Sequence, residues 1–460
     1  MFDLRQALDW LSAGRLIGDP TVKVAGVCTD TRALAPGQLF VALRGERFDA
    51  HDFLAGARAK GAAAVLFERW VEGIPLPALW VPDSRRALGE LAAGWRRRFA
   101  LPLIAVTGSN GKTTVKEMVA AILAEAFGEK ARLSTRGNLN NDVGVPLTLF
   151  NLTEAHRAAV IELGMNRPGE IAWLSEIAAP TIALVNNAQR EHQEFMRSVE
   201  ATAIENGQSI AALPADGVAV FPGDDPHTPI WRSLAGARRC FEFGLRADPA
   251  DHSRFTVSAE AGARPDGFTI AIAGQAHPVR LSIDGAHNVR NALAAAACAL
   301  AAGAGADAIV RGLERFRPAV GRLARLRAAS GATLIDDSYN ANPDSVRAAI
   351  DVLASLPAPR VLVLGDMGEV GDEGPRYHRE VGDYARERGI DRVLALGDAT
   401  RETVAACGPA AEHFDDVDAL VERARGLALP PATVLVKGSR FMRMERVVAA
   451  LAGASQVEAH

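Results

Sequence analysis

The stretch LPLIAVTGSNGKTTVKEMVAAILAEAF, residues 101–127, decides the fold of this chain. It begins with an apolar run of strand length, continues through a glycine-rich turn at 107–114, and ends with apolar residues at helical spacing. The backbone N–H groups of such a turn, together with the N-terminus of the next helix, form a cradle for phosphate oxygens. The sequence therefore predicts a nucleotide-binding loop in an α/β domain.

The residues of this loop have distinct expected roles. Gly108 and Gly111 permit the tight backbone path, Lys112 is expected to reach the β/γ-phosphates, and the Thr113 hydroxyl to bind Mg²⁺. The usual pattern, G-x-x-x-x-G-K-[ST], has a glycine where this chain has Val106, so the spacing here is a shorter variant. A chance Gly-Lys-Thr turn is the alternative, and the flanking strand and helix count against it. The expected ATP-binding residues of the loop are Gly108, Ser109, Asn110, Gly111, Lys112, Thr113 and Thr114.

The rest of the chain divides around this loop into three expected domains of an α/β protein. Residues 1–98 mix short strands and helices, and residues 99–320 alternate strands with helices, which predicts a parallel sheet covered on both faces. Residues 321–460 repeat the strand-then-helix pattern of a Rossmann-like domain. The region 224–281 is rich in Gly and Pro and predicts antiparallel strands or an insertion. We expect a helix at 87–99 whose final three arginines form a solvated face.

Composition narrows the class of protein. The chain has 48% hydrophobic and 23% charged residues, which is typical of globular domains, and its net charge of −4 argues against a general nucleic-acid binder. No apolar run reaches the roughly 18 residues that a membrane helix needs. The start, MFDLRQALDW, lacks the apolar core of a signal peptide. We therefore expect a cytoplasmic protein with no nucleic-acid partner and no membrane insertion.

Several further stretches, in an order that covers nearly the whole chain, resemble the Mur ligase family. The combination is far more specific than any one motif. The stretches are TGSNGKTT (107–114), GNLNNDVGVPLTL (137–149), IELGMNRPGEI (161–171), NNAQREH (186–192), GAHNVRNALAA (285–295), DDSYNANPDS (336–345), LGDMGEVGDE (364–373) and VKGSRFMRME (436–445).

Within that family, the motifs DSYNANP, LGDMGE and KGSR are similar to those of the branch that adds D-alanyl-D-alanine to UDP-N-acetylmuramoyl-tripeptide. The resemblance implies a monomeric enzyme of peptidoglycan synthesis that converts ATP to ADP and phosphate and forms an acyl phosphate. The stretch CTDTRALAPGQLFVALRGERFDAHDF, residues 28–53, is similar to that branch's UDP-binding domain.

The resemblance also implies where the catalytic and metal-binding side chains lie. Lys112, Glu162 and His192 would be catalytic, and Thr113, Glu162 and His192 would bind Mg²⁺, since Mg²⁺ prefers oxygen ligands and one His is tolerable. From their residues alone, Glu162 could be a strand-end surface carboxylate and His192 an ordinary histidine.

The remaining implied site residues bind nucleotide or substrate. Asn288 and Asn291 would meet the adenine, although they could equally cap a helix, and Arg322 and Asp337 would meet the phosphates and ribose. The amide-rich turn with Asn138, Asn140 and Asn141 would bind substrate, or would simply be an Asn-rich turn. The expected dipeptide-binding residues are Tyr339, Asn340, Asn342, Lys437, Ser439 and Arg440. The expected uridine-nucleotide-binding residues are Asp30, Thr31 and Arg32.

One position departs from the family pattern. Most members have a lysine fourteen residues after the metal-site histidine, and that lysine is carbamylated and helps to hold a second metal. Here the position is Asn206, and no lysine occurs between Lys130 and Lys437. Either Glu205 or Asn206 takes over the role, or a water or anion does, or the second metal is held more weakly.

Three alternatives to this function stay open. A sister ligase that adds a single amino acid, or a folylpolyglutamate synthase, would share the loop but should lack DSYNANP together with LGDMGE. A non-catalytic P-loop regulator should lack Lys112, Glu162 or His192, and all three are present. A simple kinase or GTPase would not need two extra domains.

Overall fold

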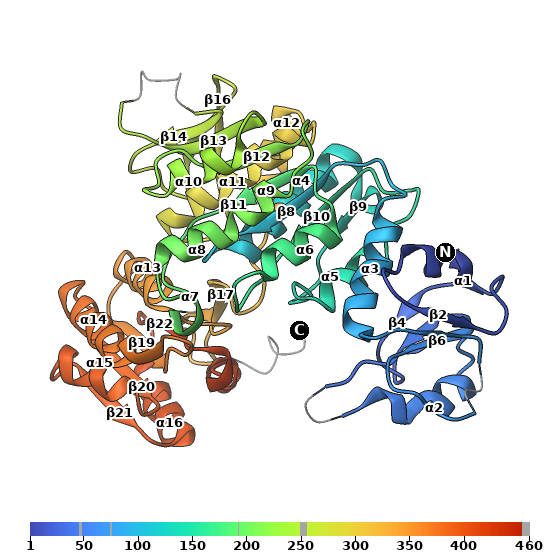
Figure 1. Ribbon diagram of the computed structural model, residues 1–460. Helices are drawn as coiled ribbons and strands as arrows, with labels where there is room; N and C mark the ends of the chain where they lie inside the picture. The colour runs from blue at the N-terminus through green and yellow to red at the C-terminus, as the bar shows by residue number, and fades with distance from the viewer. Residues whose placement is uncertain (46–47, 74–75, 192, 249–254, 453–460) are drawn as a thin grey trace.

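The computed structural model describes residues 1–45, 48–73, 76–191, 193–248 and 255–452. These residues form three α/β bodies in chain order, which confirms the predicted fold class (Figure 1). In this view the N-terminal body (blue) lies to the lower right of the middle one, and the C-terminal body (orange) lies to its lower left. No helix in these described ranges is both long and apolar enough to cross a membrane.

The N-terminal body is built on a sheet of strand order β2-β7-β6-β5-β4. Strand β2 runs antiparallel to β7, and the other neighbours are parallel, so the sheet is mixed. The elements are β1 (Phe2–Asp3), α1 (Leu4–Trp10), β2 (Arg15–Ile17), β3 (Lys23–Val24), β4 (Val27–Cys28), β5 (Leu39–Val41), η1 (Ala50–Phe53), α2 (Leu54–Ala59), β6 (Ala64–Phe67), β7 (Ala78–Trp80) and α3 (Ser84–Arg96).

The middle body carries the sheet β16-β15-β14-β13-β12-β11-β8-β10-β9, whose central strands β8, β10 and β11 are buried throughout. Burial on both faces explains why these strands are continuous apolar runs. The first elements are β8 (Leu103–Thr107), α4 (Lys112–Phe127), η2 (Glu129–Ala131), β9 (Arg132–Ser134), α5 (Gly144–Leu149), β10 (Ala158–Glu162), α6 (Glu170–Ala178), β11 (Ile182–Val185), α7 (Gln193–Met196), α8 (Val199–Asn206) and α9 (Gln208–Ala211).

The second half of this sheet confirms the antiparallel strands expected for residues 224–281 in its last part and corrects the expectation in its first part. Strands β13 and β14 extend the sheet in parallel, whereas β15 pairs antiparallel with both β14 and β16. The region therefore continues the main sheet and ends in antiparallel strands. The elements are β12 (Val218–Pro222), α10 (Thr228–Ala235), β13 (Arg239–Arg246), β14 (Val257–Glu260), β15 (Phe268–Ile272), β16 (Gln275–Val279), α11 (Ala286–Ala301) and α12 (Ala306–Arg315).

The C-terminal body has the strand order β17-β18-β22-β19-β20-β21, parallel except for β17 against β18. The elements are β17 (Ala324–Arg327), β18 (Thr333–Asp337), α13 (Pro343–Ala354), β19 (Arg360–Gly365), η3 (Gly371–Glu373), α14 (Gly374–Glu387), β20 (Arg392–Leu396), α15 (Thr400–Cys407), β21 (Ala411–Phe414), α16 (Val417–Leu427), β22 (Thr433–Lys437), η4 (Arg440–Met442) and α17 (Glu445–Leu451).

Helix α3 joins the N-terminal body to the middle one. It corrects the expected solvated arginine face for Arg96, whereas Arg97 and Arg98 are exposed as expected. Gly89 lies so close to Trp173 and Ile177 of α6 that a Cβ there would come within 2.8 Å of both side chains. Arg96 is buried and donates to the carbonyl oxygens of Ala178, 3.2 Å away, and of residues in the following turn. Burial lowers the pKa of its guanidinium. Three consecutive arginines cannot face one way on a helix, so one of them is drawn into the junction.

Candidate functional site

A cavity of about 1140 Å³ lies at the carboxyl ends of β8, β10 and β11 and is lined by side chains from all three bodies. This is where open α/β sheets bind ligands. The residues singled out from the sequence that line it are Ser109, Asn110, Gly111, Lys112, Thr113, Thr114, Asn138, Asn140, Asn141, Glu162, Asn288, Asn291, Arg322, Asp337, Tyr339, Asn340, Asn342, Lys437 and Arg440.

The phosphate loop follows β8 directly and is shaped by its two glycines. Gly108 has φ +126° and Gly111 has φ +82°, backbone conformations that side chains with a Cβ rarely adopt. A Cβ on Gly111 would also come within 2.6 Å of the amide oxygen of Asn291 and within 2.8 Å of the amide nitrogen of Asn186. Glycine is therefore required here by conformation and by space.

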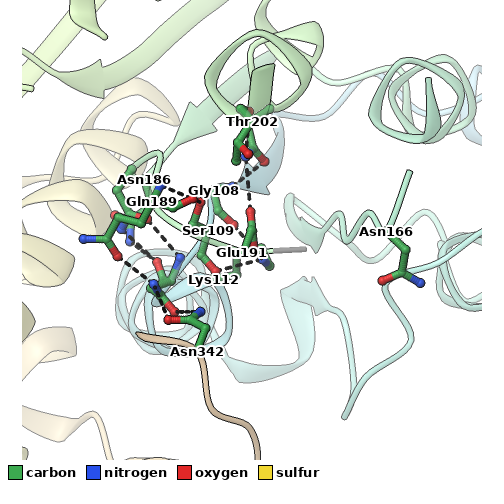
Figure 2. Close-up of polar contacts among 12 residues, drawn as sticks. Gly108, Ser109, Lys112, Asn166, Asn186, Gln189, Glu191, Thr202 and Asn342 are labelled. Carbon is green, nitrogen blue, oxygen red and sulfur yellow. Dashed lines mark hydrogen bonds and ion pairs between the residues drawn. The ribbon is translucent and has the colours of Figure 1, made fainter. Parts of the chain in front are cut away.

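A network of amides holds this loop in place (Figure 2). The Asn110 N–H donates to the Asn187 side chain at 2.9 Å, and both Asn186 and Asn187 donate to the Asn110 carbonyl oxygen. Ser109 and Gln189 exchange two hydrogen bonds of 2.8 and 3.2 Å. These partners come from the segment after β11, so the neighbouring strand fixes the loop.

Lys112 starts α4, and its ammonium group is fully hydrogen-bonded within the described chain. Nζ donates to the carbonyl oxygens of Gly108 at 2.6 Å and Ser109 at 3.2 Å, and it pairs with the Glu191 carboxylate at 3.1 Å. Glu191 is buried, so this ion pair is shielded from water. The ammonium group lines the cavity and can exchange these acceptors for phosphate oxygens.

Glu162 ends β10 beside the loop, and its surroundings fit a hard cation. It is buried, and its Oε1 accepts from the Thr113 hydroxyl at 3.3 Å and the Asn140 amide at 2.9 Å. Its Oε2 is buried without a hydrogen-bond partner among the described residues. A buried carboxylate oxygen left unpaired is costly unless something else satisfies it. The carboxylate and hydroxyl are therefore a donor set that Mg²⁺ would accept.

The expected third metal ligand, His192, lies outside the described residues. Within the described ranges, no group of three or more His, Cys, Asp or Glu side chains is arranged to hold a metal ion. A Mg²⁺ site with few protein ligands and several waters does not need such a group.

The surroundings of Asn206 do not fit a carbamate-held second ion. Its side chain accepts from the Gly108 N–H at 2.8 Å and donates to the Glu191 carboxylate at 3.4 Å and the Thr202 carbonyl oxygen at 3.1 Å. Glu205 instead accepts from the N–H of Ile171 at 3.0 Å. Both side chains are thus used in hydrogen bonds within the protein.

Asn288 and Asn291 are buried in the first turns of α11, close to the loop. The amide of Asn291 donates to Asn288 at 2.8 Å and accepts from Asn186 at 2.9 Å. The amide of Asn288 donates to the Asp284 carbonyl oxygen at 2.6 Å. Through Asn186, the two side chains therefore link α11 to the segment that holds the loop. Among the described residues, neither side chain accepts from a first-turn N–H as a helix cap would.

On the C-terminal side, Arg322 reaches across to the loop. Its Nη2 donates to the Thr113 hydroxyl at 3.2 Å, and its guanidinium lies 4.0 Å from the centre of the Tyr339 ring. Buried Lys437 pairs with Asp337 at 2.6 Å and donates to the Asn340 carbonyl oxygen at 2.9 Å. This ion pair joins the ends of neighbouring strands β18 and β22.

Three of the expected dipeptide-binding residues, Asn342, Ser439 and Arg440, differ from one another in where they lie at the site. Asn342 caps α13 and also exchanges hydrogen bonds with Asn110 of the loop, the shorter at 2.9 Å. Ser439 is buried behind the cavity wall, where its hydroxyl accepts from the Gly368 N–H and donates to the Ala341 carbonyl oxygen. Arg440 is exposed on the cavity rim and pairs with nearby Glu445.

The three asparagines of the amide-rich turn differ in what their side chains contact. The Asn141 amide oxygen accepts from the N–H groups of Val143 and Gly144 at the start of α5, which is the work of a turn residue. Asn140 reaches Glu162, and Asn138 is exposed at the cavity.

The segment Asp30, Thr31 and Arg32 follows β4 in the N-terminal body and does not line the cavity. Asp30 and Arg32 form an exposed ion pair of 2.7 Å, which holds the pKa of Asp30 at about 2. The Thr31 carbonyl oxygen accepts from Lys60 at 2.7 Å. The described geometry therefore gives these residues local contacts only.

The sequence reasoning missed the role of Arg190, although it lies inside the quoted NNAQREH stretch. Arg190 leaves the segment after β11 and forms ion pairs with Asp344 of α13 and Glu380 of α14, at 2.5 and 2.7 Å. It thereby ties the middle body to the C-terminal one. Glu380 also pairs with Arg347, and these two arginines hold its pKa at about 2.

Comparison with known proteins decides the family. Residues 23–96, 106–299 and 321–440 match the family models described as the Mur ligase family catalytic domain, the Mur ligase middle domain and the Mur ligase glutamate ligase domain. The chain belongs to the Mur ligase family. The predicted resemblance is confirmed.

Relatives of this Mur ligase match it from end to end. UDP-N-acetylmuramoyl-tripeptide--D-alanyl-D-alanine ligase of Escherichia coli (strain K12) is 44% identical over 450 residues, which cover 97% of this chain and 98% of that protein. The ligase of the same name from Haemophilus influenzae is 39% identical, with 95% of each chain covered. The crystal structure of MurF from Acinetobacter baumannii is 35% identical, has a TM-score of 0.89, and covers 97% of this chain and 98% of its own.

Proposed function

We propose that this Mur ligase joins D-alanyl-D-alanine to UDP-N-acetylmuramoyl-tripeptide, with conversion of ATP to ADP and phosphate, to give the pentapeptide precursor of peptidoglycan. The observation that carries the proposal is the cavity in which the phosphate loop faces Tyr339, Lys437 and Arg440 of the C-terminal body. The full-length relatives that are named for this reaction support it.

The chemistry has two steps. A carboxylate oxygen of the tripeptide attacks the γ-phosphorus of ATP, the bond to the β-phosphate oxygen breaks, and ADP leaves. The amine of the dipeptide then attacks the acyl carbon and loses a proton, and phosphate leaves from the acyl phosphate. Both steps concentrate negative charge, which Lys112 and Arg322 at the cavity wall would offset.

Mg²⁺ would be held by the Thr113 hydroxyl, the Glu162 carboxylate and His192, and would supply further charge neutralisation at the phosphates. Asn288 and Asn291 would position the adenine, and Arg322 and Asp337 the phosphates and ribose.

The other site residues take substrate roles in this proposal. Residues 1–98 would bind the UDP end of the sugar peptide, 99–320 would bind ATP, and 321–460 would complete the ATP and dipeptide sites of a cytoplasmic monomer. The uridine-nucleotide contacts would be Asp30, Thr31 and Arg32. The tripeptide contacts would be Asn138, Asn140 and Asn141. The dipeptide contacts would be Tyr339, Asn340, Asn342, Lys437 and Arg440, and buried Ser439 would support the cavity wall behind them.

The test is phosphate release from ATP by the purified protein with Mg²⁺ and the UDP-linked tripeptide, with and without D-alanyl-D-alanine. We expect release only when both substrates are present, and a product whose mass equals the tripeptide plus the dipeptide minus water. Release with a single amino acid, or with glutamate and a folate, but not with the dipeptide would assign the chain to a sister ligase instead.

A further inference from the structure

Asn206 occupies a position that links the phosphate loop to the loop's ion pair. It ends α8, is 1% exposed, and lies behind the loop as seen from the cavity, which it does not line. Its side-chain oxygen accepts from Gly108 of the loop, and its amide group donates to Glu191 of the segment after β11 and to Thr202 of its own helix. A fully bonded buried amide of this kind fixes the atoms around it in one arrangement.

The first contact fixes the peptide group of Gly108. Asn206 accepts from the Gly108 N–H at 2.8 Å, and Lys112 donates to the Gly108 carbonyl oxygen at 2.6 Å. The main chain of Asn206 adds to this, because its carbonyl oxygen accepts from the Thr107 hydroxyl at 3.2 Å and the Ser209 hydroxyl at 2.9 Å. The last residue of β8 and the first of the loop are therefore both held by Asn206.

The second contact orients the carboxylate that pairs with Lys112. Glu191 gives one oxygen to Asn206 at 3.4 Å and the other to the Lys112 ammonium group at 3.1 Å. Glu191 is 5% exposed, so its two partners satisfy a charge that water does not reach. Asn206 thereby restricts where the Lys112 ammonium group can sit.

We propose that Asn206 is a positioning residue for nucleotide binding, which holds the Gly108 peptide and, through Glu191, the Lys112 ammonium group in the geometry that receives the phosphates. This inference rests on the proposed function only in that the loop binds ATP. An amide suits the position because it accepts from a backbone N–H and donates to a carboxylate at the same time, which neither Asp nor Lys can do.

The test measures ADP affinity by calorimetry on the full-length chain, together with the thermal midpoint without nucleotide. Asn206→Ala removes one acceptor and two donors, and we expect it to weaken ADP binding by about tenfold or more. The matched control is Gln208→Ala, since the half-buried Gln208 also donates to the carbonyl oxygen four residues before it, that of Ile204, but does not touch the loop. The control should bind ADP within about twofold of the original chain.

A second pair of variants keeps the proposal testable if Asn206→Ala folds poorly. Asn206→Asp has the same shape but sets a carboxylate against Glu191, so ADP affinity should fall. Adding Glu191→Gln restores one amide and one carboxylate in exchanged places. The effect of Glu191→Gln on ADP affinity should therefore be more favourable in the Asn206→Asp variant than in the original chain.

The outcomes separate the two proposals. If the original chain does not bind ADP, both this inference and the proposed function fail. If it binds ADP and every Asn206 variant that folds binds it within about twofold, the inference alone is overturned, and Asn206 has only a structural role. A rise in KM for ATP without a rise in KM for D-alanyl-D-alanine in Asn206→Ala is the further result expected of a positioning residue.

Discussion

The two ends of the cavity differ in how their side chains are held. At the phosphate loop, the lining residues Asn288 and Asn291 are at most 5% exposed and are hydrogen-bonded to each other. At the outer end, Arg440 has 61% of its side chain exposed and pairs with a residue of its own segment. The side chains at the inner end are therefore held in place by contacts within the folded protein, whereas the exposed side chain of Arg440 is free to change conformation when a ligand binds.

The largest expected effect is at the inner end. Lys112→Ala removes the cation that lines the cavity beside the loop and leaves Glu191 buried without its ionic partner. We expect kcat to fall by about 10³-fold or more, because one cation at a transferring phosphoryl group is worth that much. Steady-state phosphate release measures it. Arg440→Ala, the outer counterpart, should act mainly on KM for D-alanyl-D-alanine, and an equal loss of kcat in both variants would contradict the comparison.

The next effect concerns folding stability. Lys437→Ala leaves Asp337 as an uncompensated buried charge, and we expect the free energy of unfolding to fall by about 3–5 kcal/mol. Arg440→Ala breaks an exposed pair and should cost about 1 kcal/mol or less. Urea unfolding of both variants provides the comparison, and similar losses would show that burial does not distinguish these two pairs.

A smaller effect is the acid sensitivity of the junction between the middle and C-terminal bodies. The pKa of Glu380 is held at about 2 instead of 4.5 by hydrogen bonds from Arg190 and Arg347. Its ionised form therefore stabilises the fold above about pH 4.5, and that contribution is lost as the pH falls towards 2.

Glu380→Gln should accordingly be less stable than the original chain at pH 6, and the difference should shrink at pH 3. Urea unfolding at the two pH values measures this, with the exposed Glu387→Gln on the same helix as the control. A difference that stays constant with pH would mean that the ion pairs at Glu380 do not contribute to stability.

The last prediction is that removal of bicarbonate has no effect on kcat. Because Asn206 stands where a carbamylated lysine would need carbon dioxide, removal of bicarbonate from the assay should leave kcat unchanged. Phosphate release in degassed buffer, with and without added bicarbonate, checks this. A restoration of activity by bicarbonate would show that a carbamate forms elsewhere in the site.

Much of the fold was predictable because its signals are local. The pattern at residues 101–127 predicted the strand β8, the glycine turn and the helix α4, and the recurring strand-then-helix pattern predicted the α/β class. The parallel pairing of β13 and β14 was not predictable, since alternating short runs fit either direction of pairing.

Many of the residues that line the cavity were predictable from the sequence, but their contacts were not. Motifs predicted that Asn291 and Lys112 bind nucleotide, and both line the cavity. The partners of Arg190, in contrast, lie 154 and 190 residues further along the chain. The hydrogen bond between Asn206 and Gly108 spans 98 residues. From the sequence, Asn206 was noted only as the position at which the lysine of the family pattern is absent. Contacts of this length arise from strand order, which no local pattern contains.

The most direct test of the proposed ligation uses UDP-linked tripeptide labelled with oxygen-18 in its terminal carboxylate. With ATP, Mg²⁺ and D-alanyl-D-alanine, an acyl phosphate must transfer one labelled oxygen to the released phosphate for every pentapeptide formed. Mass spectrometry of both products should therefore show singly labelled phosphate together with the pentapeptide. Unlabelled phosphate, or labelled phosphate with no pentapeptide, would contradict the mechanism or the acceptor that we propose.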